Sequence, residues 1–340
     1  MRTVERVQTA TCRMRWTIGN LLGFFLLLLI AASFAQASDF CPNGCRCDPK
    51  RTSLECTGLE FPQLSAILNN HSFVDSYNTR LFNLSLVNCS LSDVNVLPLP
   101  LIRGLLYLDL SHNELNDFKF ESPSHFMPLL IALKLTGNHL VGISRTLFSS
   151  VPNVEEVVLD GNKIFTIDWE AFRLYKLKRL WIARNNLLSI NEHILRFSRP
   201  TWSLPRPFRL ATNQLSSSFF SARRLVELNL SHNRIQRLDY DSFVPLHQLQ
   251  TLDLSFNNFS EVPVGLTQFV GLRVLNFSGN PITRLRSGDF RLPVLQVIVV
   301  SSCPLLRILE SKSFMEMPNI QTVEISHNPQ LQFIFAVCLS

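Results

Sequence analysis

An eleven-residue pattern recurs along most of this 340-residue chain and constrains its fold more than any other feature. It reads Leu-x-x-Leu-x-Leu-x-x-Asn-x-Leu at residues 105–115, and later copies carry Leu, Val, Ile or Phe at the apolar positions. Aligned on the Asn, or on a Cys in its place, the copies fall at 89, 113, 138, 162, 185, 213, 233, 257, 280, 303 and 328. Most steps are 23–25 residues, and the steps of 28 and 20 on either side of Asn213 restore the phase. This period predicts a repeat solenoid.

The Leu-x-Leu centre of each copy is apolar at every second residue, which predicts one short strand per copy with its apolar side chains inward. No single repeat can bury that face alone, so the core forms only between neighbours. Strands of successive repeats then stack in parallel, about 4.8 Å apart. The expected fold class is an α/β repeat solenoid.

The frame resembles the extracellular leucine-rich repeat proteins of the typical class, which include chaoptin, tartan and capricious, Slit, Toll ectodomains and the small leucine-rich proteoglycans. The resemblance covers residues 81–335, about eleven repeats, and implies a horseshoe with a parallel concave sheet and an irregular convex side. It implies a ladder of asparagines, in which Cys89 and Cys303 would be buried structural thiols. It also implies a spine of phenylalanines on the convex side, at Phe126, Phe148, Phe172, Phe243, Phe290 and Phe314.

Residues 1–37 have the pattern of a targeting signal: four arginines, an apolar run over 21–32 and a small-x-small site at 35–37. The run is short for a membrane span, although an uncleaved signal anchor is an alternative, and no later segment is apolar enough to span. Removal of 1–37 leaves 28 basic and 25 acidic side chains, a net charge of +3. Neither nucleic acid nor an anionic membrane is indicated as a partner.

Four cysteines follow at Cys41, Cys45, Cys47 and Cys56. In an exported chain they indicate disulfides, and three pairings are possible; a zinc site is the less favoured alternative. The resemblance implies an N-terminal cysteine cap over 38–62 with the pairs Cys41–Cys47 and Cys45–Cys56. Residues 63–80 are expected to link this cap to the first repeat, and a short helix is possible within 65–77.

Six Asn-x-Ser sequons support an extracellular glycoprotein. They lie at Asn70, Asn83, Asn88, Asn229, Asn258 and Asn276. Asn229 and Asn276 stand between strand leucines, so glycans there would project from the concave face.

Two regions depart from the frame. Residues 191–207, with three prolines and three arginines, predict a loop that bulges from the solenoid, either as a tolerated insertion or as a binding loop. At the far end the repeats stop at 336–340, without the complete cysteine-rich cap that is usual in the family, and Cys338 stands alone. Truncation, an unusual cap or an edge covered by a partner are the three interpretations of this end.

No catalytic motif or cofactor-binding loop occurs, so we expect neither an enzyme nor a cofactor or metal site. The histidines of the recurring Ser-His-Asn at 112, 232 and 327 belong to repeats five and four steps apart, too far to share an ion.

What remains is a surface for protein binding. An outward Trp flanked by Arg beside an acidic strip has the composition of an interface hot spot. The candidate residues are Tyr107, Glu155, Glu156, Asp160, Lys178, Arg179, Trp181, Arg184 and Arg209. The alternative for Trp181 is burial under Trp202 or Pro205 of the proline-rich loop.

We therefore expect a secreted or cell-surface protein that binds an extracellular protein ligand or receptor in recognition, adhesion or signalling. Alternatives are a matrix or growth-factor-binding protein and innate immune recognition. The partner and the oligomeric state do not follow from the sequence.

Overall fold

The computed structural model describes residues 41–77, 81–120, 125–168, 171–190, 224–238 and 246–334. All of these except 41–43 belong to one compact unit that starts at Gly44. Every helix and strand of the described residues lies in this unit.

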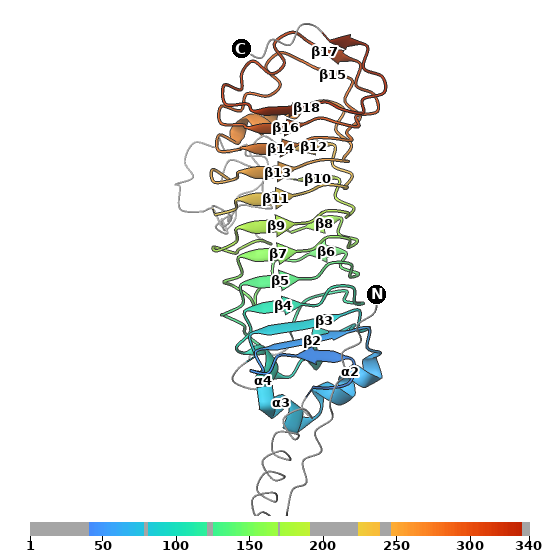
Figure 1. Ribbon diagram of the computed structural model, residues 1–340, viewed down its shortest axis with the longest axis vertical. Coiled ribbons are helices and arrows are strands. Elements are labelled where there is room, and N and C mark those ends of the chain that lie inside the picture. The colour runs from blue at the N-terminus through green and yellow to red at the C-terminus, as the bar shows by residue number, and fades with distance from the viewer. Residues whose placement is uncertain are drawn as a thin grey trace, which may run out of the picture. The chain divides into compact units, whose positions relative to one another are not determined.

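One twelve-stranded sheet runs along the whole unit (Figure 1). Its first two strands are antiparallel, and every later neighbour is parallel. In spatial order the strands are β1 (Cys45–Cys47), β2 (Ser53–Thr57), β3 (Asn83–Val87), β4 (Tyr107–Asp109), β5 (Ala132–Lys134), β7 (Glu156–Val158), β9 (Arg179–Trp181), β11 (Glu227–Asn229), β13 (Thr251–Asp253), β14 (Val274–Asn276), β16 (Val297–Val299) and β18 (Thr322–Glu324). The predicted parallel sheet is confirmed, and every predicted repeat except the copy at Asn213 supplies one strand to it.

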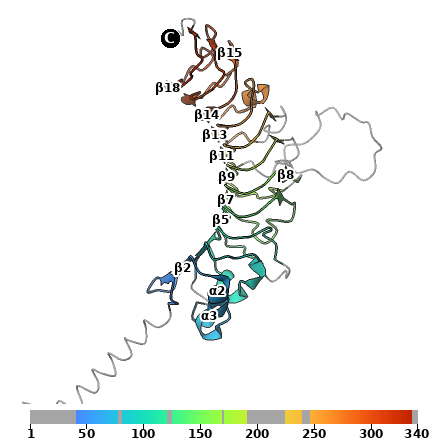
Figure 2. The same cartoon turned by 90° about the vertical axis from the view of Figure 1, so that its right-hand side faces the viewer.

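The return paths of most turns carry two-residue strands, helices or 3₁₀ turns, which lie opposite the long sheet (Figure 2). Two-residue strands pair in parallel as β6 (Gly142–Ile143) with β8 (Thr166–Ile167), β10 (Ser189–Ile190) with β12 (Arg237–Leu238), and β15 (Arg284–Leu285) with β17 (Ile308–Leu309) and β19 (Phe333–Ile334). The helical elements are α2 (Phe61–Leu68), α3 (His71–Tyr77), α4 (Leu99–Ile102) and the 3₁₀ turns η1 (Val94–Val96) and η3 (Val264–Gln268). This is the irregular side expected from the sequence.

The core lies between the two sides and is built from the apolar positions of the repeat. The middle residue of each parallel three-residue strand points inward, as Leu108, Leu180 and Leu252 do with at most 1% of their surface exposed. Full burial of one such side chain contributes about 1.5–3 kcal/mol. The first and third residues of the same strands face outward, so the strand pattern alone divides core from surface.

The predicted asparagine ladder is present and joins each turn to the next. Asn138 is representative: its Nδ2 donates to the Leu110 carbonyl of the preceding turn at 2.9 Å, and its Oδ1 accepts the Leu115 N–H at 3.1 Å. Cys89 and Cys303 occupy ladder positions as buried free thiols, as expected. Burial raises the pKa of both thiols, which keeps them protonated.

The prediction that the copy at Asn213 forms a separate turn of the sheet is wrong. β9 pairs directly with β11, with Arg179 opposite Glu227. The ladder crosses the same step, since Asn233 Nδ2 donates to the Ile182 carbonyl at 2.9 Å and Asn233 Oδ1 accepts the Leu187 N–H at 3.2 Å. The turns that carry Asn185 and Asn233 are therefore direct neighbours in the sheet although 48 residues separate the two asparagines. The predicted loop over 191–207 and Asn213 itself lie outside the described residues.

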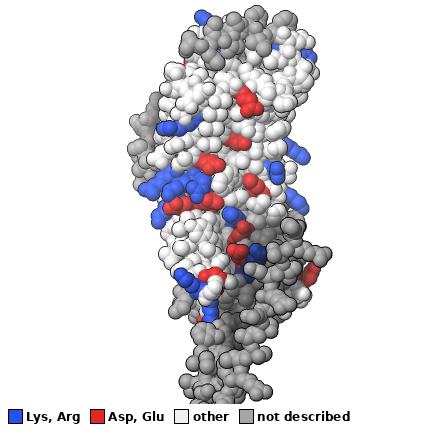
Figure 3. Space-filling view, in the orientation of Figure 1, with Lys and Arg blue, Asp and Glu red and all other residues white. Residues whose placement is uncertain are grey.

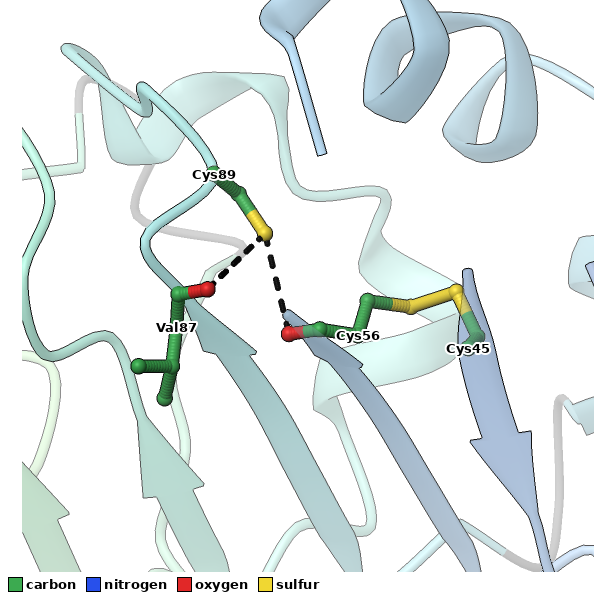
Figure 4. The surroundings of a disulfide bond; sticks show 4 residues. All are labelled: Cys45, Cys56, Val87 and Cys89. Carbon is green, nitrogen blue, oxygen red and sulfur yellow. Dashed lines mark hydrogen bonds between the residues drawn. A yellow bond between two sulfur atoms is a disulfide. The ribbon is translucent and has the colours of Figure 1, made fainter. Parts of the chain in front are cut away.

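The sheet begins earlier than expected, inside the cysteine cap. A disulfide joins Cys45 of β1 to Cys56 of β2, the pair that the resemblance implied (Figure 4). Cys41 and Cys47 are disulfide-bonded as well; their pairing with each other stays a prediction. The Cys89 thiol lies beside this bond and contacts the Cys56 carbonyl at 3.6 Å.

β2 pairs in parallel with β3, so the segment between them is a turn of the solenoid and not the expected linker over 63–80. α2 and α3 form there because apolar residues recur at helical spacing, and Leu64, Leu68, Phe73, Val74 and Tyr77 are buried. The short helix suggested for 65–77 thus corresponds to two helices.

The phenylalanine spine is correct in part. Phe148 stacks on Phe172 and Phe290 on Phe314, with ring centroids 5.6 and 6.2 Å apart. Phe126 is 47% exposed, and Met127 takes the buried position instead. Phe243 lies outside the described residues.

Candidate functional site

The outward side chains of the long sheet form a continuous surface, here called the sheet face. It consists of the first and third residues of each parallel strand, together with the residues that directly precede them and follow them at the strand ends. Because these positions are free of core packing, their chemistry decides what the solenoid can bind.

Opposite charges gather on β7 and β9, where Figure 3 shows Lys and Arg side chains directly above Asp and Glu. Glu155 Oε2 lies 2.7 Å from Lys178 Nζ. Glu156 Oε2 accepts from Arg179 Nη2 at 2.6 Å and from its Nε at 3.0 Å. Both cations are 42% exposed at the side chain, so each pair contributes only about 0–1 kcal/mol to stability.

Trp181 belongs to the same surface and is half-buried. Its indole Nε1 donates to Glu227 Oε1 on β11 at 3.0 Å. The direct pairing of β9 with β11 brings Glu227 there, opposite Arg179. The sequence frame missed Glu227 because it placed a repeat between these strands. The six residues Glu155, Glu156, Lys178, Arg179, Trp181 and Glu227 are called the charged cluster below. The burial of Trp181 under Trp202 or Pro205 concerns residues outside the described ranges.

Asp160 and Arg184, which were predicted to bind a partner, lie beside the cluster at the strand ends. Asp160 has a structural role, because its Oδ1 accepts the Ala183 N–H at 2.7 Å. Ser278 stands at the equivalent position of a later repeat, where its hydroxyl accepts the Ser301 N–H at 3.1 Å. Burial raises the pKa of Asp160, against the opposing effects of that hydrogen bond and of Arg184. Arg184 is exposed with a positive φ of 54°.

The other two candidates are not in the cluster. Tyr107 stands on β4, three strands from β9, and is 48% exposed. It borders a shallow hollow of about 100 Å³ with Asn83, Asp109, Ala132 and Lys134. Arg209 lies outside the described residues.

The six sequons differ in what their side chains do. Asn229 Oδ1 accepts the Ser231 N–H at 2.9 Å, and Asn276 Oδ1 accepts the Ser278 N–H at 3.2 Å. Asn70 Oδ1 accepts the Phe73 N–H at the start of α3. Asn83, Asn88 and Asn258 are exposed. Which of the six carry glycans stays a prediction.

In the part of the chain that the structure describes, no three His, Cys, Asp or Glu side chains converge as metal ligands would. His112, His232 and His327 follow β4, β11 and β18, four strands apart in each case instead of the predicted five and four. At about 4.8 Å per strand they are roughly 19 Å apart. The helices within the described ranges are all too short or too polar to cross a bilayer.

The family model for the leucine-rich repeat matches residues 212–259. Together with the ladder and the parallel sheet, this decides the classification. The chain is a leucine-rich repeat protein. It is 27% identical over 319 residues to Tsukushi of Gallus gallus, covering 93% of this chain and 73% of that one. It is 30% identical over 179 residues to lumican of Rattus norvegicus, covering 50% of this chain and 49% of that one.

A solved structure supports the same fold for this leucine-rich repeat protein. An octameric complex of latrophilin 3, Unc5D and FLRT2, in which FLRT2 contributes a leucine-rich repeat domain, matches with a TM-score of 0.55. The identity is 20%, and the match covers 85% of this chain and 77% of that one.

Proposed function

We propose that this leucine-rich repeat protein is an extracellular glycoprotein that binds another extracellular protein through its sheet face, in recognition, adhesion or signalling. Support comes from the disulfide-bonded cap, which requires an oxidising compartment, and from the relatedness to Tsukushi and lumican. The FLRT2 domain, part of a complex with two other proteins, shows that the fold is used for binding elsewhere.

The charged cluster is the proposed centre of the contact, and the observation that carries it is the pairing of its charges. Glu156 and Glu227 flank Arg179 in register on the two neighbouring strands, and Trp181 is held by Glu227. Side chains that are already fixed lose little conformational entropy when a partner binds. A held Trp beside a held Arg is also the type of residue pair that dominates interface energies.

The test is a double substitution, Arg179→Ala with Trp181→Ala, in the full chain secreted from cultured cells. Partners are first identified by screening the tagged protein against a panel of secreted and cell-surface ectodomains and matrix proteins. We expect the double variant to bind the identified partner at least about tenfold more weakly, as loss of a hot spot does.

A matched control removes a charge pair elsewhere. Arg286 Nη1 lies 3.5 Å from Glu261 Oε2, and both residues lie outside the long sheet and are well exposed. Arg286→Ala with Glu261→Ala should secrete normally and leave binding unchanged. Equal affinity of the Arg179/Trp181 variant and the native protein would overturn the proposed site; a partner class other than an extracellular protein would overturn the proposed function.

A further inference from the structure

Among the sequons on the sheet face, Asn83 differs because its side chain supports no backbone group. The last residue of several strands is Asn or Asp followed two residues later by Ser, and its side chain accepts that serine's N–H. Asp109 and Asp253 do so at 3.0 and 2.8 Å, just as Asn229 and Asn276 do. The sequons at 229 and 276 therefore satisfy a backbone requirement that aspartate satisfies equally well.

Asn83 begins β3 and does not cap a strand end. Within the described residues no hydrogen bond to either side-chain atom of Asn83 is formed, and the residue is exposed. Its amide nitrogen is free for attachment of a sugar. The sequons at 229 and 276 are explained by the side-chain hydrogen bond at the strand end, whereas the sequon at Asn83 is not.

Tyr107 stands directly opposite Asn83 on the neighbouring strand. Adjacent strands are about 4.8 Å apart, so the first sugar on Asn83 would start beside the tyrosine ring. Tyr107 is 48% exposed and is the most exposed large apolar side chain of the twelve-stranded sheet within the described residues. Its ring face carries partial negative charge and is apolar, which suits the C–H face of an N-acetylglucosamine ring.

Space for such a sugar exists next to the ring. The hollow of about 100 Å³ is bordered by both Asn83 and Tyr107, and its other walls include the small residues Ser85 and Ala132. Asp109 and Lys134 stand at its rim and offer a carboxylate and an ammonium group to sugar hydroxyls and the acetamido carbonyl. Neither is in a salt bridge within the described residues.

We propose that Asn83 carries an N-linked glycan whose first N-acetylglucosamine packs on the Tyr107 ring and occupies this hollow. The glycan covers the sheet face at β3–β5 and leaves the charged cluster on β7–β11 as the open part of that face. Tyr107, predicted above to bind a partner, then contacts the glycan and not a protein partner. This inference requires export of the chain but does not depend on the charged cluster being a binding site.

The experiment uses the full chain secreted from a mammalian cell line. Occupancy of Asn83 is measured by peptide mass spectrometry after enzymatic deglycosylation in ¹⁸O water, and we expect it to be high. Nitration of Tyr107 by tetranitromethane is then followed by the same method, with exposed Tyr175 as an internal standard. We expect Tyr107 to be nitrated several-fold more slowly in the glycoprotein than in a Ser85→Ala variant, and Tyr175 at equal rates in both.

A double-mutant cycle in melting temperature gives an independent readout. Ser85→Ala should lower the Tm by a few degrees in the native background and in the Tyr107→Phe background, because both keep an aromatic ring at position 107. In the Tyr107→Ala background it should leave the Tm unchanged. Ser72→Ala, which removes the sequon at Asn70 and leaves its helix cap intact, should give the same small shift in all three backgrounds.

Should Ser85→Ala not be secreted, the native glycoprotein is trimmed by an endoglycosidase to a single N-acetylglucosamine and by a peptide N-glycosidase to none. Protection of Tyr107 should survive the first treatment and vanish after the second. An unmodified Asn83, equal nitration with and without the glycan, or strictly additive Tm shifts would each overturn the proposal. Loss of partner binding in the Arg179/Trp181 variant is a separate outcome.

Discussion

Substitution of Asn233 by Ala tests the continuity of the solenoid across the 48-residue step. Asn233 is 7% exposed and connects the turns on either side of this step. Its Nδ2 donates to the carbonyls of Ile182, Leu230 and Ser231 at 2.9, 3.1 and 3.1 Å, and its Oδ1 accepts the Leu187 N–H at 3.2 Å. Alanine removes all four contacts and puts nothing in their place.

The expected cost follows from those contacts. Two amide protons are shared among three carbonyls, so roughly two donated hydrogen bonds are lost, at about 0.5–1.5 kcal/mol each. The buried Leu187 N–H is left without an acceptor, which costs about 1–3 kcal/mol. We expect a loss of about 3 kcal/mol in the free energy of unfolding, a large part of the 5–15 kcal/mol typical of folded proteins.

Urea unfolding followed by tryptophan fluorescence measures this loss. Asn257→Ala is the matched control, because Asn257 makes the same bonds across an ordinary step, to Leu230, Leu254 and Ser255 and from the Ile235 N–H. Both variants should lose similar stability. Hydrogen exchange supplies the local readout: Asn233→Ala should strongly deprotect the Leu187 amide. Unchanged protection of that amide would refute direct contact between the two turns.

Three further predictions concern other positions. Asp160→Ser should stabilise the protein at pH 7, since Ser serves at the equivalent ladder position and burial raises the pKa of Asp160 above its unfolded value. The ionised Asp160 carboxylate therefore destabilises the native protein as pH rises from its unfolded pKa through its raised folded pKa. The gain in free energy of unfolding from Asp160→Ser, measured by urea titration, should shrink below about pH 4, where Asp is protonated in both states. A gain that grows in acid would contradict this. Gly279→Ala should lower the free energy of unfolding by about 2 kcal/mol, because Gly279 has a φ of +69° and an added Cβ would lie 2.5 Å from the Phe256 ring. The control is Gly58→Ala, at φ +72° with open space around it, which should cost only about 1 kcal/mol in the same urea assay. Equal costs would refute the contact with Phe256. Exchanging charges by Glu155→Lys with Lys178→Glu should keep the ion pair and the fold, as judged by circular dichroism, but weaken partner binding severalfold; undiminished affinity would remove this pair from the proposed interface.

The repeat frame predicted the fold because each of its positions has one physical role. Leucines at alternate positions must be buried, and an asparagine amide can satisfy the backbone of two turns at once. Cys89 and Cys303 fitted the same logic, since a thiol can also donate to a carbonyl there. Local pattern and global packing agree at these positions, so sequence reasoning succeeds.

The sequence-based predictions failed where the spacing of residues was the only evidence for which segments are neighbours in the fold. The copy at Asn213 matched the pattern, but only strand pairing reveals which copies are neighbours, and the Trp181–Glu227 contact depends on that. The segment between β2 and β3 was expected to be a linker with one short helix instead of a full turn with two, because its apolar pattern is short. The position of Phe126 depended on one residue of offset, which Met127 fills instead.

The direct junction between β9 and β11 has a consequence for cooperativity. In a solenoid each turn is stabilised mainly by its two neighbours, as in a one-dimensional chain of coupled units. An extra full turn of poor sequence would have been a weak link, at which the chain could melt into two halves. Because β9 pairs directly with β11 and the Asn233 hydrogen bonds cross the same step, the turns before and after it are coupled as strongly as any others. We therefore expect the turns on both sides of this junction to unfold together in one cooperative transition.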